Sequence, residues 1–302
     1  MPFYIVVEKQ TNRLTLRSFE SPSRVLRTFH SITGAVLGDK QIEGDRRTPE
    51  GIYFVTREIP RPRLQKLHGA AAFELDYPNI VDRLAKKTGS GIWIHGVDNE
   101  KRLEKRFDTL GCVALGNADV VELGKMFQWK RTPVLVVDTE VPEQLGLESP
   151  EGPIGRRVQA WAQAWSAKDQ DAYISFYGDR FSSKGMDRAA WDKYKRRLAK
   201  NYAKIDVKIE NLRVLRHPKY SVTLFDQFYE SDRYRAQSSK VLYWDGNGPD
   251  ARIAAEIVAG EIAGPIELEE QRALPAPASK EPEEGEEGAR ISTSPSTASM
   301  GG

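Results

Sequence analysis

Gly91-Ile92-Trp93-Ile94-His95-Gly96 has the alternating pattern of a β-strand. The alternation places Ile92 and Ile94 on a core face and Trp93 with His95 on the opposite face. Downstream, Thr109-Leu110-Gly111-Cys112 ends seventeen residues after His95, and the residues from Cys112 to Leu115 predict a second extended segment. We expect the two segments to be neighbouring strands, so that Cys112 and His95 face one cleft.

Cys112 is the only cysteine among 302 residues, so it has no partner for an internal disulfide. A thiol attacks a carbonyl as the thiolate, and an adjacent imidazole can take its proton. Cys112 is therefore the predicted nucleophile and His95 the predicted base. On the residues alone, the alternative that Cys112 is a small buried apolar residue stays open.

Gly96 and Gly111 stand beside these two side chains. A residue without a Cβ lets the backbone approach a substrate and lets amides turn toward a developing oxyanion, although ordinary turns also use glycine. Asn117 precedes the stretch Ala118-Asp119-Val120-Val121-Glu122-Leu123 and is predicted to be a helix N-cap.

In this order, His95-Gly96, Thr109-x-Gly111-Cys112 and Asn117-x-Asp119 resemble the catalytic signature of the YkuD family of L,D-transpeptidases. The upstream Thr48-Pro49-Glu50-Gly51 is similar to the family's threonine-proline-x-glycine element, and an apolar hairpin is expected from Phe3 to Leu16. The resemblance covers about residues 3 to 138. It implies a mostly β catalytic domain with mixed sheets and short helices.

The resemblance also implies a reaction. Cys112 would attack the carbonyl of the third residue of a peptidoglycan tetrapeptide stem and expel the terminal D-alanine. His95 would be the base, the Gly96 carbonyl would orient the imidazole, and amides near Gly111 and Cys112, in the turn that begins at Thr109, would form the oxyanion hole. The acyl-enzyme would pass to an amine, giving a cross-link or exchange, or to water, giving a trimmed tripeptide.

Two positions depart from the common family pattern: Leu110 stands where many members have histidine, and Ala114 stands where many have arginine. An arginine at position 114 would share the strand face of Cys112 and hold a substrate carboxylate. Its absence puts the usual cross-linking substrate mode in doubt. Arg47, or its neighbour Arg46, is a candidate replacement cation from the upstream loop, unless these arginines are simply solvated. Trp93 is either a wall of the cleft or a packing residue.

The composition changes between residues 141 and 155, where three prolines and three glycines interrupt strand and helix periodicity. We predict a catalytic domain over residues 1–140, a linker over 141–155, a second domain over 156–268 and a disordered tail over 269–302. The tail has too few apolar residues to offset the entropy cost of ordering.

The second domain is predicted to open with three helices, in which aromatic residues such as Trp161 and Trp165 recur at helical spacing. Four strands follow, beginning near residues 205, 221, 237 and 252. This order resembles the SnoaL-like, nuclear-transport-factor-like α+β cone, whose curved sheet wraps a pocket. Candidate pocket groups are Gln227, Tyr229 and Lys240, although a solvated sheet face would explain them equally well.

Charge argues against a nucleic-acid partner, because 45 basic and 43 acidic residues give a net charge of only +2. Basic residues of the third predicted helix, Lys195 among them, are interleaved with aspartates and are expected to be solvated. The four histidines are scattered, and no metal-binding motif occurs. We predict neither a metal nor a cofactor.

A YkuD-like domain followed by such a cone resembles the helical cell-shape L,D-carboxypeptidases, which trim stems rather than cross-link them. L,D-transpeptidase and L,D-carboxypeptidase activities both stay open. So does a catalytically silent protein that binds muropeptides or cell wall, and, more remotely, a cytoplasmic cysteine hydrolase acting on another peptide. Peptidoglycan stem peptides are the expected partner, and the sequence leaves the oligomeric state open.

The first strand follows Met1-Pro2 directly, without a leader of signal-peptide type, and no apolar run is long enough to span a membrane. Because peptidoglycan lies outside the cytoplasmic membrane, the resemblance implies a periplasmic or cell-envelope protein. We therefore expect an export segment, alone or with an N-terminal domain, to be missing from this sequence.

Overall fold

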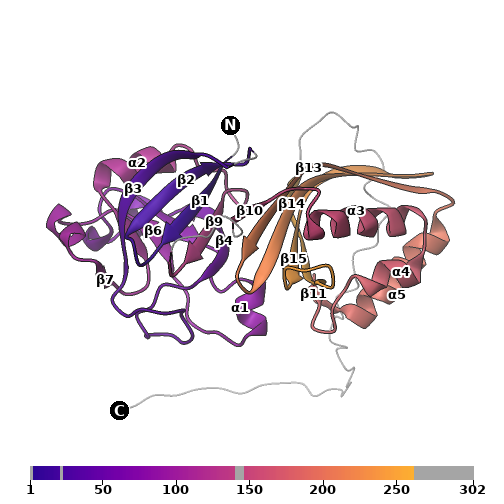
Figure 1. The fold of residues 1–302 in the computed structure, drawn as a ribbon, viewed down its shortest axis with the longest axis horizontal. Coiled ribbons are helices and arrows are strands. Elements are labelled where there is room, and N and C mark those ends of the chain that lie inside the picture. Colours follow the sequence, from indigo (N-terminus) through magenta and orange to yellow (C-terminus); the bar gives the residue numbers. More distant parts are fainter. Residues whose placement is uncertain (1–2, 21–22, 140–145, 262–302) are drawn as a thin grey trace, which may run out of the picture. The chain divides into compact units, whose positions relative to one another are not determined.

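The computed structural model describes residues 3–20, 23–139 and 146–261, which contain two large β-sheets (Figure 1). The predicted disordered tail at 269–302 lies outside the described residues, as does the first part of the predicted linker. The strands of the amino-terminal half are β1 (Phe3–Glu8), β2 (Arg13–Ser18), β3 (Val25–Gly34), β4 (Gly51–Glu58), β5 (Ala72–Leu75), β6 (Trp93–His95), β7 (Phe107–Thr109), β8 (Val113–Leu115) and β9 (Pro133–Val137). Its helices are η1 (Arg61–Arg63), η2 (Lys66–His68), α1 (Ile80–Leu84), η3 (Glu100–Glu104) and α2 (Asn117–Gly124).

The first sheet closes into a barrel. Its strand order is β2-β1-β9-β4-β5-β6-β8-β3-β7, and an additional pairing of β2 with β3 joins the ends of an eight-stranded ring, to which β7 is added. Closure leaves the ring without unpaired edges. The interior is apolar, with Ile94 and Val113 among the buried side chains and Val120 and Leu123 contributed by α2. The predicted mostly β catalytic domain with short helices is confirmed.

The predicted neighbours β6 and β8 pair in parallel, with Ile94 opposite Val113 and His95 opposite Ala114. Ile94, Val113 and Leu115 point into the main core, whereas Ala114 belongs to a separate small cluster on the other face. This alternation is the one predicted from the sequence. It leaves Trp93, His95 and Cys112 on the face away from the barrel interior.

The second sheet is antiparallel, in the order β10-β13-β14-β15-β16. Its elements are β10 (Gly146–Glu148), α3 (Pro153–Ser166), α4 (Gln170–Ser175), the small hairpin β11 (Ser182–Ser183) and β12 (Met186–Asp187), α5 (Arg188–Asn201), β13 (Ile205–His217), β14 (Tyr220–Ser231), β15 (Arg235–Asp245) and β16 (Arg252–Glu261). The three helices cover one face of the sheet (Figure 1). Between them lies an aromatic core with Trp161, Trp165 and Trp244, so the predicted α+β domain is confirmed.

The predicted linker contains more regular structure than its composition indicated. Residues 146–148 form β10, which pairs with β13, and α3 begins at Pro153 rather than beyond 155. Proline is well suited to the first helical position because it has no amide hydrogen to leave unpaired there. Its presence therefore marked the start of a helix as well as a break.

A third apolar cluster contains side chains from both sheets. Tyr4 of β1, Ile52 of β4 and Leu135 of β9 are buried together with Val222 of β14 and Tyr243 of β15. The described residues of both halves belong to one compact unit. The part of the outer face of the second sheet that carries these residues is therefore a packing face and not a solvated one.

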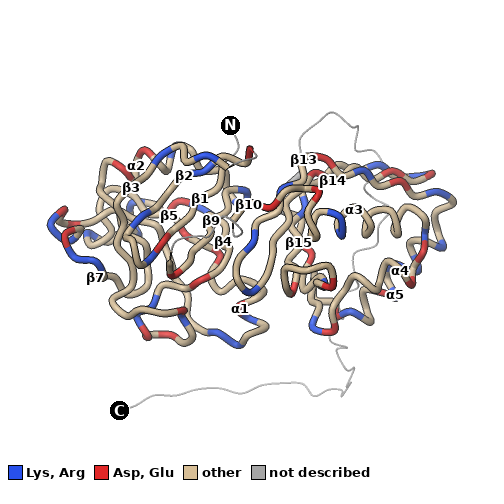
Figure 2. Tube along the Cα trace, in the orientation of Figure 1, with Lys and Arg blue, Asp and Glu red and all other residues tan. Residues whose placement is uncertain are grey.

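Charged residues of both signs are interspersed along the described elements (Figure 2). One residue of the basic run on α5 differs from the sequence expectation: Lys195 is 8% exposed, and its Nζ lies 4.6 Å from the Trp165 ring centroid and 4.8 Å from that of Trp191. Burial lowers the pKa of Lys195 to about 7. None of the helices in the described ranges combines the length and apolarity needed to cross a membrane.

Candidate active site

His95 is held as a base of defined tautomer. The side chain is 3% exposed, and Nδ1 lies 2.5 Å from the Gly96 carbonyl oxygen. Because a carbonyl oxygen only accepts, Nδ1 carries the proton and Nε2 of the neutral imidazole is left as the acceptor. This geometry agrees with the orienting role that the resemblance gave to Gly96.

Cys112 is half-buried and stands immediately before β8. By the β6–β8 register it lies level with Trp93, which places His95 diagonally across from it on the same face. In this structure Sγ donates to the Gly91 carbonyl at 3.5 Å. The structure thus brings the predicted nucleophile and base to neighbouring strands, with the thiol turned toward Gly91.

Both groups are uncharged near neutral pH. Burial lowers the pKa of His95 to about 4, and burial raises the pKa of Cys112 to about 11, with the Trp93 amide and the Lys40 charge acting in the opposite direction. The resting pair is therefore a thiol and a neutral imidazole rather than a preformed ion pair.

Thr109 organises the turn that leads to the thiol. Its hydroxyl donates to the Cys112 carbonyl at 2.7 Å and accepts from the Gly111 amide at 3.1 Å. Gly111 has φ +130°, and a Cβ there would lie 2.8 Å from the Arg47 carbonyl oxygen, so only glycine suits the position. The Gly111 amide is already in use, which corrects the expectation that it is free for an oxyanion.

A valine at position 109 is expected to lower the free energy of unfolding by about 1–3 kcal/mol, because the Gly111 amide loses its acceptor inside a buried turn. Thr109→Ser retains the hydroxyl and is the matched control. Urea unfolding measures the stability, and alkylation of Cys112 reports on the turn. Equal behaviour of the valine and serine variants would show that the hydroxyl does not organise this turn.

The other predicted site residues lie around the turn. Trp93 is half-buried on the same face as Cys112, and its ring centroid lies 4.8 Å from that of His68. The backbone carbonyl of Arg47 packs against Gly111. Its guanidinium reaches toward Gly38, where the guanidinium carbon would lie 4.0 Å from an added Cβ. Ala114, which stands where the resemblance led us to look for an arginine, is fully buried in an apolar cluster with Ile32, Val97 and Leu103.

The sequence analysis missed three residues of this region. His68, in η2, has its ring centroid 4.9 Å from that of His95, edge to face. The charge of Arg102, held by Asp98 and Asp108, contributes to lowering the pKa of His95. Lys40 acts electrostatically on the thiol. None of these residues carries a periodic signal, because they come from short turns and loops.

Asn117 was predicted to be the N-cap of the helix that follows it, but the N-cap of α2 is Gly116 and Asn117 is the first helical residue. Its Oδ1 accepts from the Ala70 amide and its Nδ2 donates to the Val97 carbonyl, both at 2.7 Å. The side chain therefore ties the residue after Gly96 to the loop that follows η2. It acts on the His95 segment rather than capping a helix.

Gln227, Tyr229 and Lys240, the predicted pocket groups of the second domain, share the sheet face that the helices cover. Lys240 Nζ forms a buried ion pair with Glu256 and lies 5.6 Å from the Trp161 ring centroid. Glu256 also accepts from the Tyr177 hydroxyl at 3.0 Å. Burial opposes its ionisation, but the charges of Lys240 and Lys195 outweigh burial and lower the pKa of Glu256.

Comparisons with known proteins cover both halves of the chain. Residues 2–136 match the model of the YkuD L,D-transpeptidase catalytic domain, and residues 153–257 match the Cds6 C-terminal NTF2-like domain. No curated protein sequence gives a significant match.

Two solved structures are similar over most of their length. Bd1075 of Bdellovibrio bacteriovorus is 27% identical, with a TM-score of 0.72 over 86% of this chain and 93% of that one. The helical cell shape determining protein Pgp2 of Campylobacter jejuni is 25% identical, with a TM-score of 0.65 over 85% of this chain and 91% of that one. Residues 2–136 of this protein therefore belong to the YkuD family of L,D-transpeptidase catalytic domains, and residues 153–257 form a C-terminal NTF2-like domain.

Proposed function

We propose that this protein is a peptidoglycan-processing cysteine enzyme that trims or rearranges tetrapeptide stems. The observation that carries the proposal is the bond from His95 Nδ1 to the Gly96 carbonyl, which leaves Nε2 as an acceptor on the strand beside Cys112. Membership of the YkuD family and similarity to a helical cell shape determining protein support the choice of substrate.

In the proposed reaction, the Cys112 thiol turns from Gly91 toward His95 and attacks the carbonyl of the third stem residue. Its proton passes to Nε2, a thioester forms, and the amide bond to the terminal D-alanine breaks as the imidazolium returns the proton to the leaving amine. The Cys112 amide is the proposed oxyanion donor, because the Gly111 amide is bonded to Thr109.

Water is the acceptor that we favour, which makes the protein an L,D-carboxypeptidase. Ala114 is buried among apolar side chains, so this strand presents no guanidinium to hold the carboxylate of an incoming stem. Transfer to an amine, giving a cross-link or exchange, is the alternative outcome. Because the substrate lies outside the cytoplasmic membrane, we propose a periplasmic or cell-envelope location.

To test the proposal, the purified protein is incubated with disaccharide tetrapeptide, with and without an acceptor stem or D-amino acid. The products are identified by mass spectrometry. We expect a disaccharide tripeptide that requires Cys112 and whose yield does not depend on acceptor. Cross-linked or exchanged stems would instead assign transpeptidation.

A catalytically silent muropeptide-binding protein is a second candidate, favoured by one observation. The thiol is bonded to Gly91 and has a pKa of about 11, so the resting site holds no thiolate. The binding protein would replace our proposal if the wild type formed no product in any mixture and bound muropeptides tightly, with an affinity that Cys112→Ala left unchanged.

A further inference from the structure

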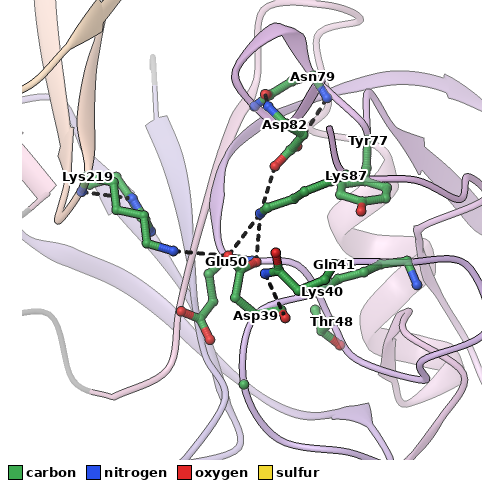
Figure 3. Close-up of polar contacts among 12 residues, drawn as sticks. Asp39, Lys40, Gln41, Thr48, Glu50, Tyr77, Asn79, Asp82, Lys87 and Lys219 are labelled. Atoms are coloured by element: carbon green, nitrogen blue, oxygen red, sulfur yellow. Dashed lines mark hydrogen bonds and ion pairs between the residues drawn. The ribbon is translucent and has the colours of Figure 1, made fainter. Parts of the chain in front are cut away.

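A hairpin of the NTF2-like domain contacts the loop that borders the Cys112 turn. β13 and β14 are joined through Pro218 and Lys219, with His217 paired to Tyr220. We call residues 217–220 the hairpin tip, and residues 35–50, between β3 and β4, the catalytic loop. Figure 3 shows Lys219 of the hairpin tip reaching toward Asp39 of the catalytic loop.

Tyr220 anchors the hairpin tip at the end of the catalytic loop. Its ring is buried, and its hydroxyl oxygen accepts from the Ile52 amide at 2.6 Å. Asn79 Nδ2 approaches the same oxygen at 3.4 Å. The absence of a side chain at Gly51 leaves room for the Tyr220 hydroxyl, because a Cβ there would lie 2.8 Å from it. The β4 backbone is therefore built to receive a side chain from the other domain.

Lys219 adds an ion pair at the start of the loop. Its Nζ lies 3.0 Å from Asp39 Oδ2, while Lys87 Nζ lies 2.9 Å from both Asp39 oxygens (Figure 3). Asp39 Oδ1 also accepts from the Glu50 amide at 3.0 Å, so this carboxylate ties the two ends of the catalytic loop. Burial opposes its ionisation, but these donors outweigh burial and hold the pKa of Asp39 below its ordinary value.

The same loop acts on the Cys112 turn in three ways, two by contact and one by charge. Thr48 Oγ1 approaches the Cys112 carbonyl at 3.5 Å, and the Arg47 carbonyl stands against Gly111. Lys40 follows Asp39 directly, and its charge favours the thiolate of Cys112. Lys40 Nζ is fixed 2.7 Å from Asp45 Oδ1 and 3.1 Å from the Ile42 carbonyl, so its position depends on the loop conformation.

We propose that the hairpin tip is a positioning element for the nucleophile: Lys219 and Tyr220 hold the catalytic loop in the arrangement that sets Lys40, Arg47 and Thr48 around Cys112. The NTF2-like domain thereby contributes to the reactivity of a thiol that it does not touch. This inference rests on the proposed function, since it assigns its effect to the proposed nucleophile.

Alkylation of Cys112 by iodoacetamide tests the proposal on the full chain, without muropeptide, as a function of pH. Lys219→Met is expected to slow alkylation near neutral pH roughly two- to fivefold, the range that an exposed ion pair supports, and to shift the profile to higher pH. Tyr220→Phe retains the buried ring, removes the acceptor of the Ile52 amide, and is expected to act in the same direction. Neither change touches His95, His68 or Arg102, which the structure also places at this site.

Two controls make the result specific. Lys219→Arg keeps the charge and is expected to restore the wild-type profile, and Lys208→Met removes an exposed lysine of β13 whose ion pair is with Asp206. Thermal unfolding of each variant separates loss of stability from loss of reactivity. A lowered unfolding temperature with an unchanged alkylation profile in both tip variants would overturn the proposal, as would an equal slowing by Lys208→Met.

The measurement also separates this inference from the proposed function. Wild-type protein that forms no muropeptide product, but whose thiol still responds to Lys219→Met, would refute the enzymatic role and leave the coupling between hairpin tip and thiol standing. Protein that trims stems, but whose thiol reactivity is the same in both tip variants as in the wild type, would support the proposed function and refute the role of the hairpin tip.

Discussion

Replacement of Cys112 by alanine is expected to lower kcat for trimming of a disaccharide tetrapeptide by about 10⁴-fold or more, because the proposed acyl-enzyme forms on the Cys112 thiol. Cys112→Ser should be nearly as inactive, since a hydroxyl is harder to ionise than a thiol and the neutral imidazole offers only a weak base. Tripeptide release measured by mass spectrometry checks both variants.

The thermal unfolding midpoint is the control for the Cys112 variants. The thiol is half-buried and makes one long hydrogen bond, so the change in unfolding free energy should stay within about 1 kcal/mol. An alanine variant that folds normally and still trims stems at a substantial fraction of the wild-type rate would contradict cysteine catalysis. It would direct attention to another nucleophile or to hydrolysis by a contaminating enzyme.

Replacement of His95 by glutamine is expected to lower kcat by about 10²–10⁴-fold, the usual contribution of a positioned general base. Glutamine can keep a donor near the Gly96 carbonyl but cannot accept the thiol proton. His30→Gln is the matched control, because the His30 ring is exposed and, among the residues that the structure describes, hydrogen-bonds with the Leu103 carbonyl alone. Steady-state kinetics on the tetrapeptide substrate measure both variants.

The pH dependence of the activity is a second test of His95 as the general base. His95 has a pKa of about 4, lowered by burial, so the imidazole accepts a proton at all higher pH and activity should fall only as pH drops through about 4. Cys112 stays protonated up to about pH 11, so no basic limb is expected below that value. An acidic limb near 6.5, the ordinary value for histidine, would indicate a solvated imidazole and contradict the buried base.

Much of the fold followed from local patterns. The strand at 93–95 and the alternation after Cys112 were predictable because the side-chain period of a strand is two, whatever the strand pairs with. The helix at 153–166 and the four long strands of the second sheet were predictable for similar reasons. The linker was only partly predictable, because a proline such as Pro153 can mark the start of a helix as readily as a break in the chain.

Other features depended on which segments meet. His68, Lys40 and Asn117 gather around Cys112 and His95 only because eight strands close into a barrel and carry their loops together. What covers the outer face of the second sheet was equally unpredictable from the sequence. Val222 and Phe225 of β14 are both buried, on opposite faces, and a strand pattern cannot say which partner covers each face.

The sequence by itself determined the family, the two kinds of domain, the nucleophile and base candidates and the order of the main elements, because each of these is encoded in residue type and short-range spacing. The tertiary structure decided the protonation of the thiol and imidazole, the use of the Gly111 amide by Thr109, and the contact of Lys219 and Tyr220 with the catalytic loop. These depend on burial and on contacts between residues far apart in the chain, which are set by packing and have no local signal.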